Sequence, residues 1–118
     1  MTASEFEQRV ATALEKRGWV IIHSFDGVGT NMIASVPNGT RACIQCRNGV
    51  SWVTDYDVLL SVQAKKFYEC PIAVVVTTGS YTELARVAAY ENEVQLMWFV
   101  EETGKLEYAQ ELSRLVQR

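Results

Sequence analysis

The sequence predicts an α/β fold with a central mixed sheet of about five strands flanked by helices. Three features support this prediction: helical stripes of apolar residues behind capping patterns, short strand-like runs separated by glycine turns, and a continuous apolar run at 72–76. The 118 residues are 48% apolar and 21% charged, which is typical of a globular chain. We therefore expect residues 1–118 to form a single domain with the order α-β-β-β-α-β-α-β-α.

The first helix is expected at residues 5–17. Ser4 and Glu7 have the spacing of a capping box, and Gly18 provides a stop. The apolar residues between them recur every four positions: Phe6, Val10 and Leu14. This spacing predicts an amphipathic helix with one buried face.

Three strands are expected next, at residues 19–24, 31–36 and 40–47. They are separated by the turn sequences Asp26-Gly27 and Asn38-Gly39. Short connections of this kind join antiparallel neighbours, so we expect a three-stranded meander.

The second half of the chain alternates helices with strands. Thr54 and Asp57 predict the cap of a helix that ends before Pro71, and Ser80 and Glu83 predict the cap of another. The run at 72–76 is typical of a strand buried on both faces, and a further strand is expected at 94–100. A terminal amphipathic helix is expected from the spacing of Leu106, Ala109, Leu112, Leu115 and Val116.

Composition limits the compartment and the kind of partner. No apolar run is long enough for a signal peptide or a membrane span, and three cysteines without an export signal suggest reduced thiols. We expect a cytoplasmic protein with no disulfide and no membrane partner. The net charge of −3 argues against a broad basic DNA-binding face, although a local basic cleft remains compatible with it.

Several landmarks occur in an order that resembles the Mrr-type restriction endonuclease family of the PD-(D/E)xK nuclease superfamily. They are Phe6-Glu7 and Gly18-Trp19-Val20 around the first helix, a glycine-rich turn before Asn31, the strand motif Gln45-Cys46-Arg47, and Thr77-Thr78-Gly79 after the valine strand. The resemblance covers roughly residues 5–97. It implies a restriction-endonuclease-like fold and a nuclease site on the second and third strands.

The resemblance assigns the family's catalytic positions to Asn31, Gln45 and Arg47. In the family, an Asp and an acidic residue or Gln bind Mg²⁺, and a Lys helps to activate water. Gln45 and Arg47 are two residues apart, so they should share one face of their strand. However, Asn31 and Gln45 supply only neutral oxygens, and an arginine stays protonated and cannot serve as a base. The site is therefore expected to be degenerate, with no cofactor.

Two carboxylates offer a way to rescue metal binding. Glu7 matches the family's first-helix glutamate, and Asp26 lies in the turn before Asn31. The simpler interpretations are a helix cap for Glu7 and a turn former for Asp26. Cys43 and Cys46 have CxxC spacing, but residues three apart on a strand point to opposite faces, so we expect structural thiols rather than a metal site.

Three functional hypotheses follow, and they leave open whether the protein is an enzyme. The first is a pseudonuclease domain that binds nucleic acid (DNA) or a protein partner, with Arg47, Asn48 and Trp52 as the nucleic-acid contacts. The second is an active Mg²⁺-dependent DNA endonuclease that uses Glu7 or Asp26 together with Gln45. The third is an accessory or inhibitor protein of a phage or mobile element, active in prokaryotic defence through protein contacts. Homodimerisation is compatible with all three.

Overall fold

The computed structural model describes residues 1–27 and 29–110, with side chains described for all of these except residues 25–27. The helices are α1 (Ala3–Lys16), α2 (Asp55–Phe67) and α3 (Glu83–Glu91). The strands are β1 (Val20–Gly27), β2 (Thr30–Ser35), β3 (Arg41–Arg47), β4 (Trp52–Val53), β5 (Ile72–Thr77), β6 (Ser80–Tyr81), β7 (Val94–Val100) and β8 (Lys105–Tyr108).

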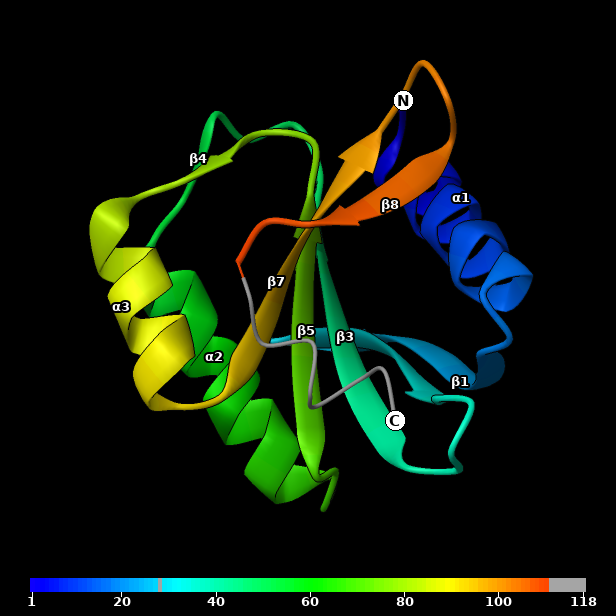
Figure 1. Ribbon diagram of the computed structural model, residues 1–118, viewed down its shortest axis with the longest axis horizontal. Coiled ribbons are helices and arrows are strands. Elements are labelled where there is room, and N and C mark those ends of the chain that lie inside the picture. Colours follow the sequence, from blue (N-terminus) through cyan, green and yellow to red (C-terminus); the bar gives the residue numbers. More distant parts are fainter. Residues whose placement is uncertain (28, 111–118) are drawn as a thin grey trace.

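A six-stranded mixed sheet forms the centre of the fold, in the order β1-β2-β3-β5-β7-β8. The expected antiparallel meander of β1, β2 and β3 is confirmed, β3, β5 and β7 run parallel, and β8 returns antiparallel to β7. Helix α1 lies on one side of this sheet, and α2 and α3 lie on the other (Figure 1). The predicted fold class is thus confirmed, with one more strand in the sheet than expected.

Side chains that alternate between the two faces of the sheet pack into two main hydrophobic cores. The larger core lies under α1 and contains Phe6, Val10, Leu14, Met32, Ala34, Ala42, Ile44, Val74, Val76, Met97 and Phe99 among others. The second core lies under α2 and α3 and contains Val53, Val58, Ala73, Val75, Tyr81, Ala85, Ala89, Val94 and Leu96. All six residues of β5 are buried, as expected for a central parallel strand covered on both faces.

Both predicted caps at Ser4 and Ser80 are wrong. In α1 the capping box is formed by Thr2 and Glu5, with the Glu5 N–H donating to Thr2 Oγ1 (3.1 Å) and the Thr2 N–H donating to Glu5 Oε1 (3.0 Å). The pattern Thr2-x-x-Glu5 matches a capping box as well as Ser4-x-x-Glu7 does, and it lengthens the helix without changing its buried stripe. In α3 the cap is Thr82, because Ser80 is in β6, paired with β4.

The predicted terminal helix is also wrong where it can be compared. Residues 105–108 form β8, an edge strand whose Leu106 packs into the core under α1. Leu106 fits both a helical spacing of three to four and the strand alternation Lys-Leu-Glu-Tyr, and the tight turn at Gly104 (φ +70°) favours the hairpin. Residues 112–116 lie outside the described part of the chain. Within the described ranges, no helix is both long and apolar enough to cross a membrane.

Candidate functional site

Asn31, Gln45 and Arg47 meet where β2 and β3 face α2. Met32 pairs with Ile44 in the antiparallel ladder, so the same register sets Asn31 beside Gln45. On β3, Ala42 and Ile44 enter the core under α1, which leaves Gln45 and Arg47 on the opposite face. Gln45 and Arg47 therefore share one face of β3, as their spacing predicts.

The side chain of Gln45 is sealed beneath α2. Only 4% of Gln45 is exposed, and its Nε2 donates to the Asp57 carbonyl (2.9 Å) and to Ser61 Oγ (2.6 Å). The Ser61 hydroxyl in turn donates to the Gly29 carbonyl (3.4 Å). These bonds tie β3, α2 and the start of β2 together, so the amide of Gln45 acts here as a structural donor.

Asn31 makes a hydrogen bond to the neighbouring strand. Its Oδ1 accepts from the backbone N–H of Cys46 over 2.7 Å. The oxygen that would face a cation in this position therefore satisfies a backbone donor of β3, and it carries no net charge. Both features weaken it as a ligand for Mg²⁺, which prefers carboxylate oxygens.

Arg47 forms an ion pair with Asp57 on the first turn of α2. Arg47 Nη2 lies 3.4 Å from Asp57 Oδ1, and the side chains are 37% and 9% exposed. Asp57 Oδ2 also accepts from the Thr54 N–H (3.0 Å) and hydroxyl (3.3 Å), so this carboxylate is the predicted cap as well as the partner of Arg47. The Nε of Arg47 is buried and has no acceptor within the described structure.

Asp57 is the member of this cluster that sequence reasoning missed. The capping pattern explained its carboxylate locally, and nothing in the spacing indicated that a strand ten residues earlier supplies a guanidinium to it. The one usable signal was that Asp57 lies in the first turn of the next helix along the chain after Arg47. A helix that follows a strand so closely commonly packs back over that strand. Its carboxylate is neutralised by Arg47 and occupied by Thr54, which leaves it poorly suited to a metal.

Of the two carboxylates proposed as rescue ligands, the structure describes the side chain of Glu7 alone, and Glu7 does not join this cluster. Glu7 is half-buried on α1, and its negative charge, together with the larger effect of burial, raises the pKa of the Cys46 thiol above its usual range. Cys46 packs against the core under α1, so Glu7 lies on the face of β3 opposite to Gln45 and Arg47. The side chain of Asp26 lies outside the described residues. The proposed cap role of Glu7 is wrong, because Thr2 and Glu5 form the box.

The three cysteines are free thiols, and they lie in two different hydrophobic clusters. Cys43 lies with Cys70 in a small buried cluster on the α2 side, whereas Cys46 packs on the α1 side, which confirms that the CxxC residues point to opposite faces. Burial is the main reason that the pKa of Cys43 rises to about 12. Among the side chains that the structure describes, no group of three His, Cys, Asp or Glu could hold a metal ion.

The loop after Arg47 carries the other two expected nucleic-acid contacts. Asn48 Nδ2 donates to the carbonyl of Met1 (3.0 Å), which ties the loop to the start of the chain. Trp52 lies on β4 and is 58% exposed. Arg47 and Trp52 therefore both reach the surface at the carboxyl end of β3, whereas Asn48 is already engaged.

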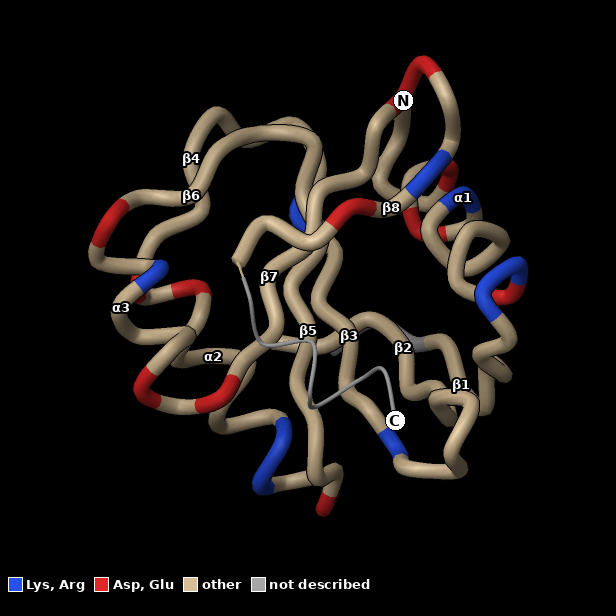
Figure 2. The backbone as a smooth tube through the Cα atoms, in the orientation of Figure 1, with Lys and Arg blue, Asp and Glu red and all other residues tan. Residues whose placement is uncertain are grey.

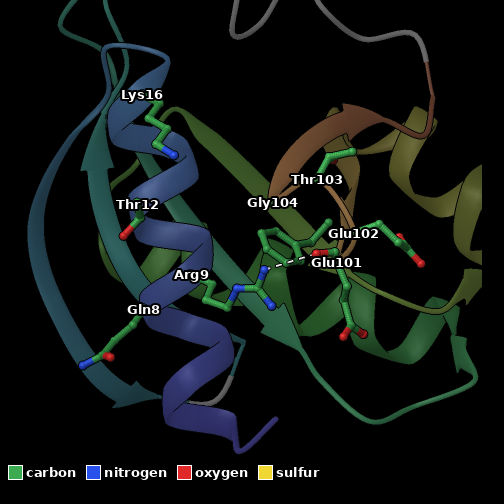
Figure 3. A pocket seen from close by; sticks show the side chains of 9 residues that line it. Gln8, Arg9, Thr12, Lys16, Glu101, Glu102, Thr103 and Gly104 are labelled. Carbon is green, nitrogen blue, oxygen red and sulfur yellow. Dashed lines mark hydrogen bonds between the residues drawn. The ribbon is translucent and has the colours of Figure 1, made fainter.

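A cleft lies elsewhere, between α1 and the β7–β8 hairpin (Figure 3). It has a volume of about 460 Å³ and is lined by Gln8, Arg9, Thr12, Lys16, Phe99, Glu101, Glu102, Thr103 and Gly104. Arg9 crosses it, donating to the Glu101 carbonyl (3.2 Å) with its guanidinium over the Phe99 ring (4.9 Å). Arg17 similarly donates to the Leu106 carbonyl and lies over Tyr108. Both arginines thus fasten α1 to the hairpin.

Comparisons with known proteins agree with this architecture. A model of the family Mrr_cat, described as restriction endonuclease, matches residues 1–101. No curated protein matches the chain. The crystal structure of AF1548, a protein of unknown function, is similar with a TM-score of 0.68 and 16% identity; the match covers 80% of this chain and 57% of that one.

A second solved structure is similar over most of both chains. It is an XisH family protein from Nostoc punctiforme PCC 73102, with a TM-score of 0.55 and 14% identity, and the match covers 89% of this chain and 98% of that one. At these identities the two structures support the fold alone. The family match adds that the Gln45-Cys46-Arg47 strand and the Asn31 strand both lie inside the matched region.

Proposed function

Because the chain belongs to the Mrr_cat restriction endonuclease family, we propose that it has kept the family's fold as a DNA-binding domain that does not cleave. The observation that carries this proposal is the Arg47–Asp57 pair, because the resemblance assigns Arg47 to the position of the family's catalytic lysine. A guanidinium at this place grips phosphate and cannot deprotonate water.

Arg47 retains the donors needed to hold a phosphate. A guanidinium has five N–H donors, and the single ion pair at 3.4 Å engages only one edge of it. The Nε–H is buried without an acceptor, so it is not the group that a DNA phosphate reaches. The side chain is 37% exposed, and the exposed part of the guanidinium is what can donate to an anionic oxygen of the nucleic-acid backbone.

Hydrolysis lacks its two requirements in this cluster. A divalent cation needs carboxylate ligands, and the oxygens present belong to Asn31, Gln45 and an Asp57 already paired with Arg47. A general base is also missing, since none of these three groups is positioned and free to accept a proton from water. Mg²⁺ does not fit this donor set, so no catalytic step is derived through it.

The alternative of a protein-binding accessory module gains some support from the charge distribution. Figure 2 shows lysine and arginine spread over α1, α3 and the ends of the sheet, with acidic residues among them. A surface of this kind predicts weak DNA affinity dominated by a few contacts.

We propose a cytoplasmic location, in keeping with three free thiols.

Metal binding and cleavage should be tested together. We expect no Mg²⁺ or Mn²⁺ binding in calorimetric titrations, and no plasmid nicking by the wild type. Metal binding with nicking that is lost in Glu7→Ala would instead establish a nuclease with a relocated carboxylate.

DNA binding should be tested by its dependence on salt. Arg47→Gln is expected to reduce the magnitude of the slope of log affinity against log salt concentration by about 1. Arg41→Gln is the matched control, because Arg41 lies at the opposite end of the same strand and is exposed. Salt-independent or absent binding by the wild type would favour the protein-binding alternative.

A further inference from the structure

Trp52 is an exposed aromatic side chain on a rigidly held backbone. Its side chain is 58% exposed, while the adjacent Val53 is fully buried in the core under α2 and α3. The N–H groups of Ser80 and Thr82 donate to the carbonyls of Ser51 and Val53, over 2.9 and 3.0 Å. The residues on both sides of Trp52 are therefore fixed, and the indole projects from a two-residue strand pair.

Gly79 also packs tightly against the loop that leads to Trp52. A Cβ atom at this position would overlap the carbonyl oxygen of Val50 and lie 2.8 Å from that of Ser51, so only glycine allows the loop to approach so closely. Thr77 Oγ1 adds a bond to the Arg47 carbonyl (2.9 Å) and accepts from the Gly79 N–H (3.0 Å). The loop that joins Arg47 to Trp52 is thus clamped at several points.

Arg47 and Trp52 lie at the two ends of this tightly held loop. Arg47 pairs with Thr77, and Trp52 pairs with Ser80, in parallel ladders on the same stretch of chain. Trp52 follows Arg47 by five residues, so their backbones lie at most about 18 Å apart. At the 3.4 Å spacing of stacked nucleotides, this corresponds to at most about five nucleotides of one strand.

We propose that Trp52 is a stacking platform for an unpaired base whose strand is held by Arg47, so that the domain prefers single-stranded DNA, or a junction with an unpaired flank, to uniform duplex. This inference rests on the proposed DNA-binding function and extends it. The indole offers its face only to a base that is not already stacked between neighbours, which duplex bases are. Stacking on an aromatic ring does not depend on net charge, so it can add to the contact that Arg47 makes with the backbone of the strand in a chain with a net charge of −3.

The test compares one labelled oligothymidine of about 12 nucleotides with a duplex of equal length by fluorescence anisotropy at low salt. Wild type is expected to bind the single strand more tightly than the duplex. Trp52→Ala should weaken single-strand binding by about 5- to 150-fold, as expected for the loss of one base–aromatic stack, and should leave duplex binding nearly unchanged. Trp52→Phe should recover most of the loss. Phe67→Ala, which removes an aromatic residue that is 78% exposed at the far end of α2, is the matched control.

The outcomes distinguish a failure of this inference from a failure of the proposed DNA-binding function. If Arg47→Gln weakens binding while Trp52→Ala binds the single strand like wild type, the stacking inference fails and the DNA-binding function stands. Equal losses on single strand and duplex in Trp52→Ala would overturn the preference for an unpaired base. If wild type binds neither oligonucleotide, both proposals fail, and the exposed Trp52 is left as a contact for a protein partner.

Discussion

The guanidinium of Arg47, at the end of β3, lies 3.4 Å from the carboxylate of Asp57, on the first turn of α2. The pair joins β3 to α2 beside the candidate site and neutralises the only described carboxylate in that cluster. Asp57 caps α2 through Thr54 at the same time. One residue therefore holds the helix in place and limits how strongly Arg47 attracts an anion.

Asp57→Asn should separate these two roles of the carboxylate. We expect a loss of about 1 kcal/mol in the free energy of unfolding, because a partly exposed ion pair and a charged cap are removed while the side-chain shape is kept. DNA affinity should rise by about 5-fold, because the Asp57 carboxylate repels a phosphate held by Arg47, and two like charges about 4 Å apart in water repel each other by about 1 kcal/mol. Urea unfolding and anisotropy measure the two effects. Asp55→Asn, on the same helical turn, is the control, and a parallel fall in both quantities would contradict the prediction.

Restoring the family residues should restore metal binding. In the double variant Asn31→Asp with Arg47→Lys, a carboxylate returns to β2 and the fixed cation becomes a lysine, so calorimetry should detect Mg²⁺ or Mn²⁺ that wild type does not bind. The single variant Arg47→Lys serves as the control, because it lacks the new carboxylate. If the double variant binds no metal, closure of the site by the Gln45 and Ser61 bonds matters more than the missing charge.

The large elements could be predicted from the sequence because each has its own periodicity. The strand expected at 94–100 matches β7. The strand expected at 31–36 is shifted by one residue from β2, and the strand expected at 40–47 begins one residue before β3. The strands β4 and β6 have two residues each, too few for any alternation to show, and they exist only because the two loops pair. The strand β8 was hidden because Leu106 fits a helical and a strand pattern equally well.

At the candidate site, the strand face of each residue could be predicted from the sequence, but the contacts could not. Spacing alone put Gln45 and Arg47 on one face, because strand side chains alternate. The bond from the Cys46 N–H to Asn31 and the ion pair of Arg47 with Asp57 depend on strand register and on how α2 packs, which are tertiary properties. Glu7 shows the converse: the resemblance to the family suggested a site residue, and the fold sets it on the opposite face of β3.

Gly79→Ala should loosen the strand pair that carries Trp52. The added methyl group would meet the Val50 and Ser51 carbonyls, and we expect a cost of about 1–3 kcal/mol, as for other overpacked sites. Hydrogen exchange should accelerate at the Ser80 and Thr82 amides, whose acceptors belong to the displaced loop. In Gly39→Ala, where a methyl group has no neighbour within 4 Å but φ is +90°, stability should fall without a change at those amides. Unchanged exchange in Gly79→Ala would refute the clamp.

The start of α1 provides a test of the capping assignment. Thr2→Ala should lower the free energy of unfolding by about 1 kcal/mol, because the Glu5 N–H loses its acceptor, whereas Ser4→Ala should have little effect. Thermal or urea unfolding of the two variants decides between the caps. A larger loss in Ser4→Ala than in Thr2→Ala would return the cap to the position suggested by the Ser4-Glu7 spacing.

The same capping box predicts a dependence on pH. The Thr2 backbone N–H, followed by the Thr2 hydroxyl, lowers the pKa of Glu5 from its ordinary value of 4.5. Because folding favours the ionised carboxylate, this contact stabilises the protein above pH 4.5, and its contribution disappears as the pH falls through the lowered pKa. The stability difference between wild type and Glu5→Gln should therefore be largest near neutral pH and shrink in acid. A difference that stays constant down to acidic pH would mean that the carboxylate does not need its charge at this position.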